Sequence, residues 1–168
     1  MKKIYIFSVT AFLIMSSSIA FANTLISEAE SRGINNVCLS HLTKIEDYHN
    51  LDGLNITFAH PTDPSDYPSL HTSNKKYNNG SSFFATVLSP DNEFCYASIN
   101  KITVINNQSC SDIAQARLVK DSTINMETYA EGSYIHISPK SSEYQLILIS
   151  TGDSSCTMTE SRMLWPEN

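Results

Sequence analysis

The chain has 168 residues, with 11 basic and 17 acidic side chains, and its formal net charge is −6 with histidine neutral. This length is sufficient for one globular domain with a hydrophobic core. The acidic balance argues against general affinity for nucleic acid or anionic lipid, so we expect no nucleic-acid partner.

The first 22 residues have the three parts of a secretory signal peptide. Lys2 and Lys3 precede an apolar run over residues 4–15, and Ala20-Phe21-Ala22 ends the segment. The run is too short to span a bilayer, which needs about 20 residues. We expect cleavage after Ala22 and one periplasmic or secreted domain over residues 23–168, without a membrane span. Nine basic residues then remain against 17 acidic ones, a net charge of −8.

The segment from Leu25 to Tyr48 has the apolar spacing of a helix and is interrupted at Gly33. After the glycine, apolar residues recur every three or four positions, and Asn35 or Asn36 is a suitable N-cap. The pattern predicts an N-terminal helix after Gly33, preceded by a short helix or lead-in.

Residues 49–82 show little periodicity and contain three prolines among many Asn, Asp and Ser residues. Only the stretch from Leu54 to Phe58 alternates enough to predict a strand. We therefore predict a long, ordered surface loop after the first helix. Loops of this length inside a compact domain are usually functional or disordered, and the aromatic residues Phe58, Tyr67 and Tyr77 favour order over disorder.

The rest of the chain predicts strands with one helix among them. Residues 83–88 and 94–99 flank a turn and form a predicted hairpin, and residues 102–105 predict another strand. Ser109 or Ser111 is a suitable cap for a short helix over residues 112–119. Further strands are predicted, with intervening turns at 139–142 and 152–154, over residues 133–138, 144–150 and 156–164.

The apolar run from Leu146 to Ile149 predicts a central strand, because both of its faces are hydrophobic. No internal repeat is visible. The predicted class is α+β: an antiparallel sheet of about six strands, packed against an N-terminal helix and one short middle helix, with a long loop after the first helix.

The four cysteines predict two disulfides, since their number is even and the chain carries an export signal. They are not spaced two to four positions apart, as zinc sites usually require. Three pairings are open. We favour Cys38 with Cys95 and Cys110 with Cys156, because this pairing ties the first helix to the sheet and the second helix to the last strand.

No catalytic motif is complete in this sequence. Gly152-Asp153-Ser154 has the order found in the nucleophile loop of chymotrypsin-like proteases, but Ser155 and Cys156 follow where that family needs two glycines for its oxyanion hole. We interpret the segment as a turn. Nucleotide-binding glycine loops are also absent. The sequence therefore favours a protein that is not an enzyme and has no cofactor.

A small, acidic, exported and disulfide-linked domain resembles the periplasmic lysozyme inhibitors and the immunity proteins that neutralise wall- or membrane-directed toxins. The resemblance implies that the protein occludes the active site of a cationic toxin or enzyme, with complementary charge accelerating the encounter. We expect the contacts on the segment from Asn50 to Asn79. The candidate binding residues are Asp52, Asp63, Asp66, Tyr67 and Tyr77.

An alternative hypothesis is a small secreted hydrolase or effector. His60, Asp63, Asp66 and His71 lie in the same predicted loop, and imidazole and carboxylate groups bind metals or transfer protons. Their spacing matches no rigid metal-binding motif, so we favour solvated loop residues over a metal site.

Overall fold

The computed structural model describes residues 24–139 and 144–166. The predicted signal peptide and most of the predicted turn at 139–142 lie outside these ranges. Within them, no helix is both long and apolar enough to cross a membrane.

Two helices lie at the N-terminus, α1 (Leu25–Ser31) and α2 (Asn36–His49). Gly33 separates them and has a left-handed φ of +77°, a conformation that favours glycine. The side chain of Asn35 caps α2, accepting a hydrogen bond of 2.8 Å from the backbone nitrogen of Val37. The interruption at the glycine and the asparagine cap are as the sequence predicted.

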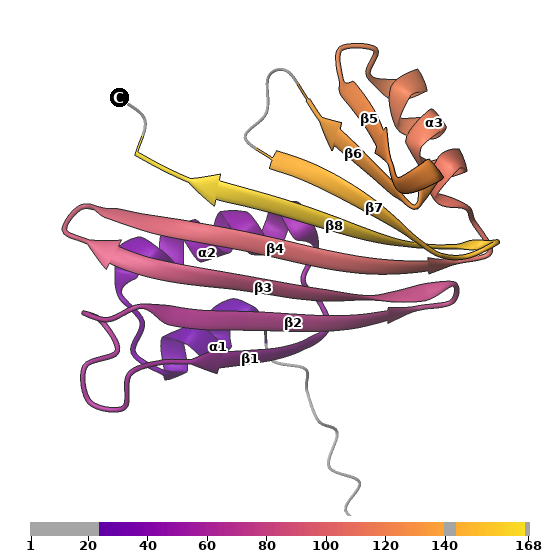
Figure 1. The fold of residues 1–168 in the computed structure, drawn as a ribbon. Coiled ribbons are helices and arrows are strands. Elements are labelled where there is room, and N and C mark those ends of the chain that lie inside the picture. Colours follow the sequence, from indigo (N-terminus) through magenta and orange to yellow (C-terminus); the bar gives the residue numbers. More distant parts are fainter. Residues whose placement is uncertain (1–23, 140–143, 167–168) are drawn as a thin grey trace, which may run out of the picture.

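The remaining elements form one antiparallel sheet of eight strands with the order β1-β2-β3-β4-β8-β7-β6-β5 (Figure 1). In chain order a third helix, α3 (Cys110–Lys120), follows β4 and precedes β5, and a short 3₁₀ turn, η1 (Ala130–Gly132), follows β5. The strands are β1 (Leu54–Phe58), β2 (Ser69–Tyr77), β3 (Gly80–Asp91), β4 (Phe94–Asn106), β5 (Asn125–Tyr129), β6 (Tyr134–Ser138), β7 (Tyr144–Gly152) and β8 (Ser155–Leu164). The α+β class is confirmed, with eight strands instead of about six.

The prediction of a long loop after the first helix is wrong, because β2 occupies much of that segment. The sequence of β2 is polar on both faces, so it lacks the alternation that reveals a strand. Its backbone nevertheless pairs with β1 on one side and with β3 on the other. The true loop is confined to residues 59–68.

Three further predictions differ from the observed sheet. Residues 102–105 continue β4 and do not form a strand of their own, because Asn100 and Lys101 stay paired with β3. The polar strand β5 was not predicted. The run from Leu146 to Ile149 lies in β7, which is an interior strand but not a central one, and its Ile147 is 40% exposed.

The sheet is built from two halves with the same order of elements. In each half one helix is followed by four strands, α2 with β1–β4 and α3 with β5–β8. The last strands of the two halves, β4 and β8, pair antiparallel at the centre of the sheet. The halves are therefore related by an approximate twofold axis through the middle of the sheet, a repeat of topology that the sequence does not reveal.

Each half contains one disulfide at an equivalent place. Cys38 of α2 is bonded to Cys95 of β4, and Cys110 of α3 is bonded to Cys156 of β8. Both cysteine pairs are buried, and each ties the start of a helix to the start of its half's last strand. The pairing favoured from the sequence is confirmed. Two disulfides indicate an oxidising, extracytoplasmic compartment.

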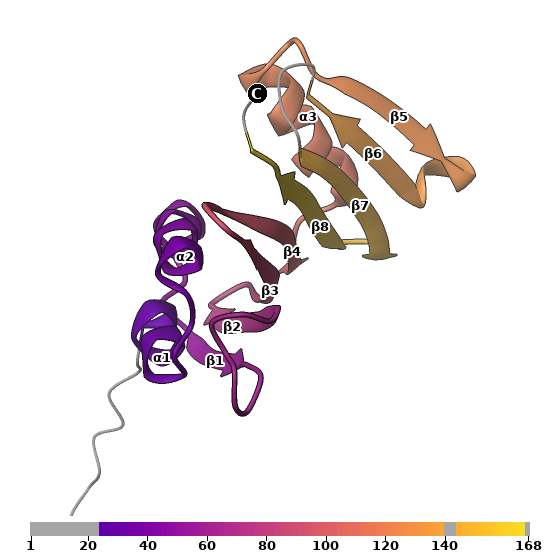
Figure 2. The same cartoon turned by 90° about the vertical axis from the view of Figure 1, so that its left-hand side faces the viewer.

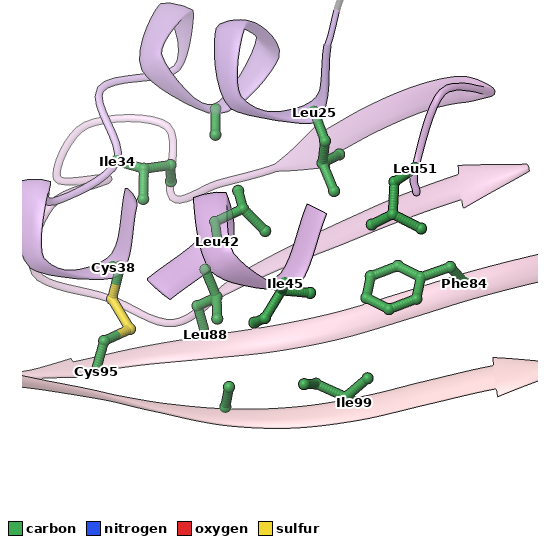
Figure 3. Close-up of a cluster of buried hydrophobic side chains, with 12 residues drawn as sticks. Leu25, Ile34, Cys38, Leu42, Ile45, Leu51, Phe84, Leu88, Cys95 and Ile99 are labelled. Carbon is green, nitrogen blue, oxygen red and sulfur yellow. A yellow bond between two sulfur atoms is a disulfide. The ribbon is translucent and has the colours of Figure 1, made fainter. Parts of the chain in front are cut away.

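All three helices pack on the same face of the sheet. Figure 2 shows α1 and α2 along one side of β1–β4. Their core joins Leu25, Leu42 and Ile45 to Phe84 and Leu88 of β3 (Figure 3). A second core lies under α3, where Ile113 packs with apolar residues of β6 and β7, namely Ile135, Ile137, Leu146 and Leu148.

The register shows that the two cores share one face, because β4 and β8 contribute to both without a break in alternation. Ala97 of the first core pairs with Leu164, and Ile105 pairs with Cys156 of the second core. No described helix covers the opposite face, which we call the open face.

Removing either disulfide is expected to destabilise the protein substantially. Replacement of Cys38 and Cys95, or of Cys110 and Cys156, by alanine should lower the free energy of unfolding by about 4 kcal/mol per pair. The reason is that the unfolded chain gains conformational entropy when the loops of 57 and 46 residues are no longer closed. The two losses should add, since the bridges lie in different halves and share no partner. Guanidinium denaturation monitored by the fluorescence of Trp165 measures this, and a loss confined to one pair would contradict it.

Candidate functional site

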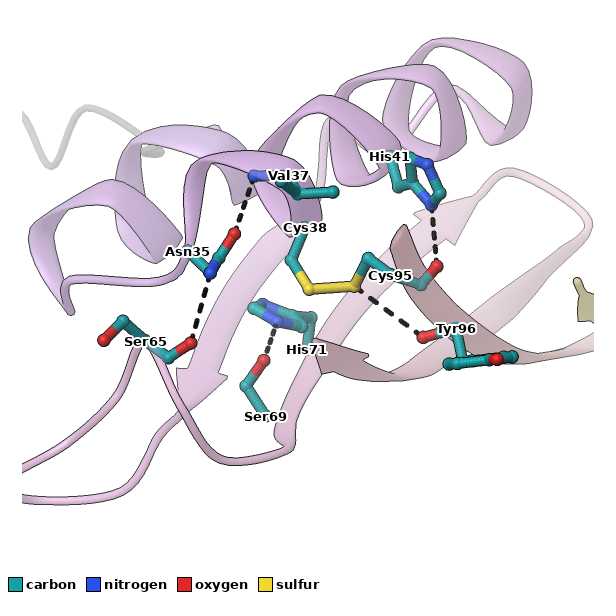
Figure 4. Close-up of a disulfide and its surroundings, with 9 residues drawn as sticks. All are labelled: Asn35, Val37, Cys38, His41, Ser65, Ser69, His71, Cys95 and Tyr96. Carbon is teal, nitrogen blue, oxygen red and sulfur yellow. Dashed lines mark hydrogen bonds between the residues drawn. A yellow bond between two sulfur atoms is a disulfide. The ribbon is translucent and has the colours of Figure 1, made fainter. Parts of the chain in front are cut away.

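The loop over residues 59–68 is anchored to the junction between α1 and α2. The amide nitrogen Nδ2 of Asn35 donates a hydrogen bond of 3.4 Å to the carbonyl oxygen of Ser65 (Figure 4). Pro64 packs beside Gly33, and its Cγ would lie 3.1 Å from a Cβ atom added to that glycine. Glycine at position 33 thus serves both the left-handed backbone and the close approach of the loop.

Contacts within the loop hold its acidic and aromatic side chains in place. The rings of His60 and Tyr67 are stacked with their centroids 4.4 Å apart. Nδ1 of His60 accepts a hydrogen bond of 3.1 Å from the backbone nitrogen of Asp63. Hydroxyl groups bind both carboxylates, from Thr62 to Asp63 at 2.7 Å and from Ser65 to Asp66 at 2.9 Å. The loop is therefore ordered by its own side chains, and we call it the acidic loop.

The structure brings together three of the five predicted binding residues. Asp63, Asp66 and Tyr67 all lie on the acidic loop and are exposed, Tyr67 to 51%. Asp52 and Tyr77 lie at the opposite end of β1 and β2, because Asp52 precedes the first of these strands and Tyr77 ends the second. They form a separate group.

This second group is organised by Lys75. Its ammonium group forms an ion pair with Asp52 and lies 5.5 Å from the centre of the Tyr77 ring. The hydrogen bond from Lys75 lowers the pKa of the Asp52 carboxyl below its usual value. Because the carboxylate is already paired with a cation, it is less available to a cationic partner than the carboxylates of the acidic loop.

The residues of the alternative hydrolase hypothesis are not gathered at one place. His60, Asp63 and Asp66 lie on the acidic loop, whereas His71 is fully buried in β2 beneath the helices. Both ring nitrogens of His71 are engaged, Nδ1 by the hydroxyl of Thr57 at 3.0 Å and Nε2 by the hydroxyl of Ser69 at 2.8 Å. Among residues 24–139 and 144–166, no group of three or more His, Cys, Asp or Glu side chains is placed to hold a metal ion.

The order Ser69, His71, Thr57 has the connectivity of a nucleophile, a base and an orienting group. All three side chains are at most 4% exposed, so a substrate has no access to them. The network instead satisfies polar groups inside the core, where an unpaired hydroxyl or imidazole would be costly. Burial lowers the pKa of His71 from 6.5 to about 4, and the ring is therefore neutral at pH 7.

His49 at the end of α2 is a second buried imidazole. Burial lowers its pKa from 6.5 to about 4, and the positive charges of Lys101 and Arg162 act in the same direction. The backbone carbonyl of His49 accepts a hydrogen bond of 3.3 Å from Nζ of Lys101, which fastens the C-terminal end of α2 to β4. Like His71, this residue is neutral in the folded protein at pH 7.

Sequence reasoning missed the residues that position the acidic loop. Asn35 was recognised as a helix cap, but its contact with Ser65 joins segments 30 residues apart and has no signature in the sequence. Gly33 was recognised as an interruption of the helix, and its contact with Pro64 likewise depends on the tertiary structure.

Comparisons of the chain with protein-family models, with curated proteins and with solved structures found no match.

The buried histidines are expected to make the fold sensitive to acid. Between pH 6.5 and about 4 the unfolded chain binds protons at His49 and His71 that the folded chain does not bind. The free energy of unfolding should therefore fall as the pH is lowered through this window, by on the order of 3 kcal/mol for His71.

The variant His71→Asn separates the contribution of His71 to the acid-induced loss of stability from that of His49. This variant should be less stable than the parent protein at neutral pH and should lose less of its stability on acidification. Val119→Asn, at an exposed position of α3 without a titratable group, is the control and should retain the parent pH dependence. Denaturant titrations on either side of the window measure both quantities, and parallel curves for the parent and His71→Asn would contradict the assignment.

Proposed function

We propose that this protein is an exported protein-binding module of the inhibitor or immunity class, which binds a cationic toxin or wall-directed enzyme in the periplasm. The acidic loop is the contact surface and occludes the active-site cleft of the partner. The observation that carries the proposal is the presentation of the exposed Asp63, Asp66 and Tyr67 by a loop that is held at Gly33 and Asn35 through Pro64 and Ser65.

Preorganisation supports this role because an ordered loop loses little conformational entropy when it binds. Stacking against His60 fixes the Tyr67 ring, and neighbouring hydroxyls orient both carboxylates. An exposed aromatic side chain flanked by charge is a common anchor at protein interfaces.

Electrostatics support a cationic partner. The whole chain has a net charge of −6, and the acidic loop contains two carboxylates and no Lys or Arg. The neighbouring helix α1 adds the carboxylate of Glu30, whereas that of Glu28 is paired with Arg32 at 3.2 Å. A surface of this sign attracts a positively charged enzyme and accelerates association at low salt.

Reversing the charge of the acidic loop should abolish much of the binding. We expect Asp63→Lys with Asp66→Lys to weaken inhibition of the target enzyme by about tenfold or more, chiefly through slower and less salt-dependent association. Asp153→Lys, in the exposed turn between β7 and β8, is the control for a change of charge elsewhere. Inhibition assays against a panel of muramidases, amidases and phospholipases test the proposal. It fails if none is inhibited, or if the loop variant inhibits as well as the parent.

The position of the loop can be tested separately from its charge. Gly33→Ala and Gly132→Ala both place a Cβ at a left-handed backbone, which should cost about 1 kcal/mol of stability in each case. Only the added Cβ at position 33 meets Pro64, whereas the one at position 132 meets no atom within 4 Å. Gly33→Ala alone should therefore weaken inhibition, and equal inhibition by the two variants would show that the anchoring is unimportant.

A further inference from the structure

The open face of the sheet is unusually apolar, beginning with its edge strand β1. Leu54 and Phe58 point to the open face and are 66% and 56% exposed, while Thr57 between them is buried on the helix face. A strand with one solvated face normally directs its apolar residues to the core. In β1 the apolar residues lie on the open face and the polar Thr57 lies on the helix face. This pattern is expected of a strand whose open face is covered by another molecule.

Apolar side chains continue across the sheet in rows set by the strand register. One row crosses β3, β4, β8 and β7 through Phe83, Ile102, Thr159 and Ile147. The adjacent row contains Val104, Thr157, Ile149 and Tyr134. The next row toward the other end of the strands is largely polar and contains Ile56, Thr72, Ala85, Asn100, Ser161 and Gln145. Beyond it, a further row contains Phe58, Leu70, Val87, Ser98 and Met163. The patch therefore spans both halves of the sheet.

Charged side chains are almost absent from this face. The alternation places only Lys76, Asp91 and Glu127 on the open side of the described strands. Each lies at the margin, at the end of β2, at the β3–β4 turn and on the edge strand β5. The whole chain, by contrast, has 17 acidic and 11 basic side chains.

The size of the face is that of a stable protein interface. Eight strands of five to 13 residues, at a rise of ~3.3 Å per residue and a spacing of ~4.8 Å, cover about 1,000 Å². A standard interface buries about 800 Å² on each partner.

We propose that the open face binds the open face of a second copy of this chain, forming a symmetric sheet-on-sheet dimer. A twofold interface places the same surface on both sides. Any charged side chain near the axis therefore faces the same side chain of the other copy and is repelled by it. A face without central charges avoids this repulsion, and it offers nothing for the charge of a cationic partner to complement. Two twisted sheets packed through apolar side chains form the core of a β-sandwich.

A hollow of about 640 Å³ on the open face improves the shape complementarity between the two copies. Phe83, Ile102 and Val104 line it, and Lys76 lies at its margin. In a face-to-face dimer this concavity receives side chains of the second copy, so the two surfaces interdigitate as sheet faces do.

Sedimentation equilibrium of the mature chain over micromolar to submillimolar concentrations tests the proposal. The parent protein should form a dimer with a dissociation constant in the micromolar range or tighter. Thr159→Glu adds a carboxylate between Ile102 and Ile147 while keeping a polar residue on the strand, and should weaken the dimer by about tenfold or more. Val119→Glu, at an 87% exposed position of α3, adds the same charge off the open face and should leave the dimer intact.

Hydroxyl-radical footprinting locates the interface independently of any variant. Oxidation of Tyr134 and Met163 on the open face should decrease as the protein concentration rises through the association range. Oxidation of Tyr48, an exposed residue of α2, should not change. A monomer at every concentration, protection confined to the helix side, or equal effects of Thr159→Glu and Val119→Glu would overturn the proposal.

Discussion

The antiparallel pairing of β4 with β8 is the interaction on which the rest of the structure depends. It runs without interruption from Ala97 opposite Leu164 to Asn106 opposite Ser155 and joins two four-stranded halves into one sheet. Because the two strands run in opposite directions, Cys95 and Cys156 lie at opposite ends of this central pair. Each disulfide then fastens a helix to the centre of the sheet. The same pairing directs both helical layers to one face and leaves the other open.

Polar residues beneath α1 and α2 specify the alignment of the outer strands. Thr57 of β1 and His71 of β2 are register partners as well as hydrogen-bond partners, and Ser69 completes the network. A slip of one residue would turn every side chain of β1 to the other face and break these hydrogen bonds. Burying a neutral histidine at this point therefore stabilises one register over its neighbours, and it makes the fold dependent on the histidine remaining unprotonated.

The two candidate contact surfaces differ in chemistry and in how far the sequence revealed them. The residues of the acidic loop were visible as charges and an aromatic ring in a proline-rich stretch, and Asp63, Asp66 and Tyr67 are indeed neighbours. Asp52, Tyr77 and His71 were grouped with them because the strand β2 was not recognised. The open face escaped prediction because its residues come from eight strands, and only their register brings them together.

The sequence by itself determined the local elements and the covalent framework. Glycine and asparagine signals marked the helix boundaries, alternation marked β1 and the β3–β4 hairpin, and the number and placement of the cysteines indicated the disulfides. The tertiary structure alone decided that Ser69–Tyr77 and Asn125–Tyr129 are strands, since their polar sequences become extended through pairing with neighbours. It also decided the repeated halves and the face left open, because both follow from pairing between β4 and β8, which begin about 60 residues apart.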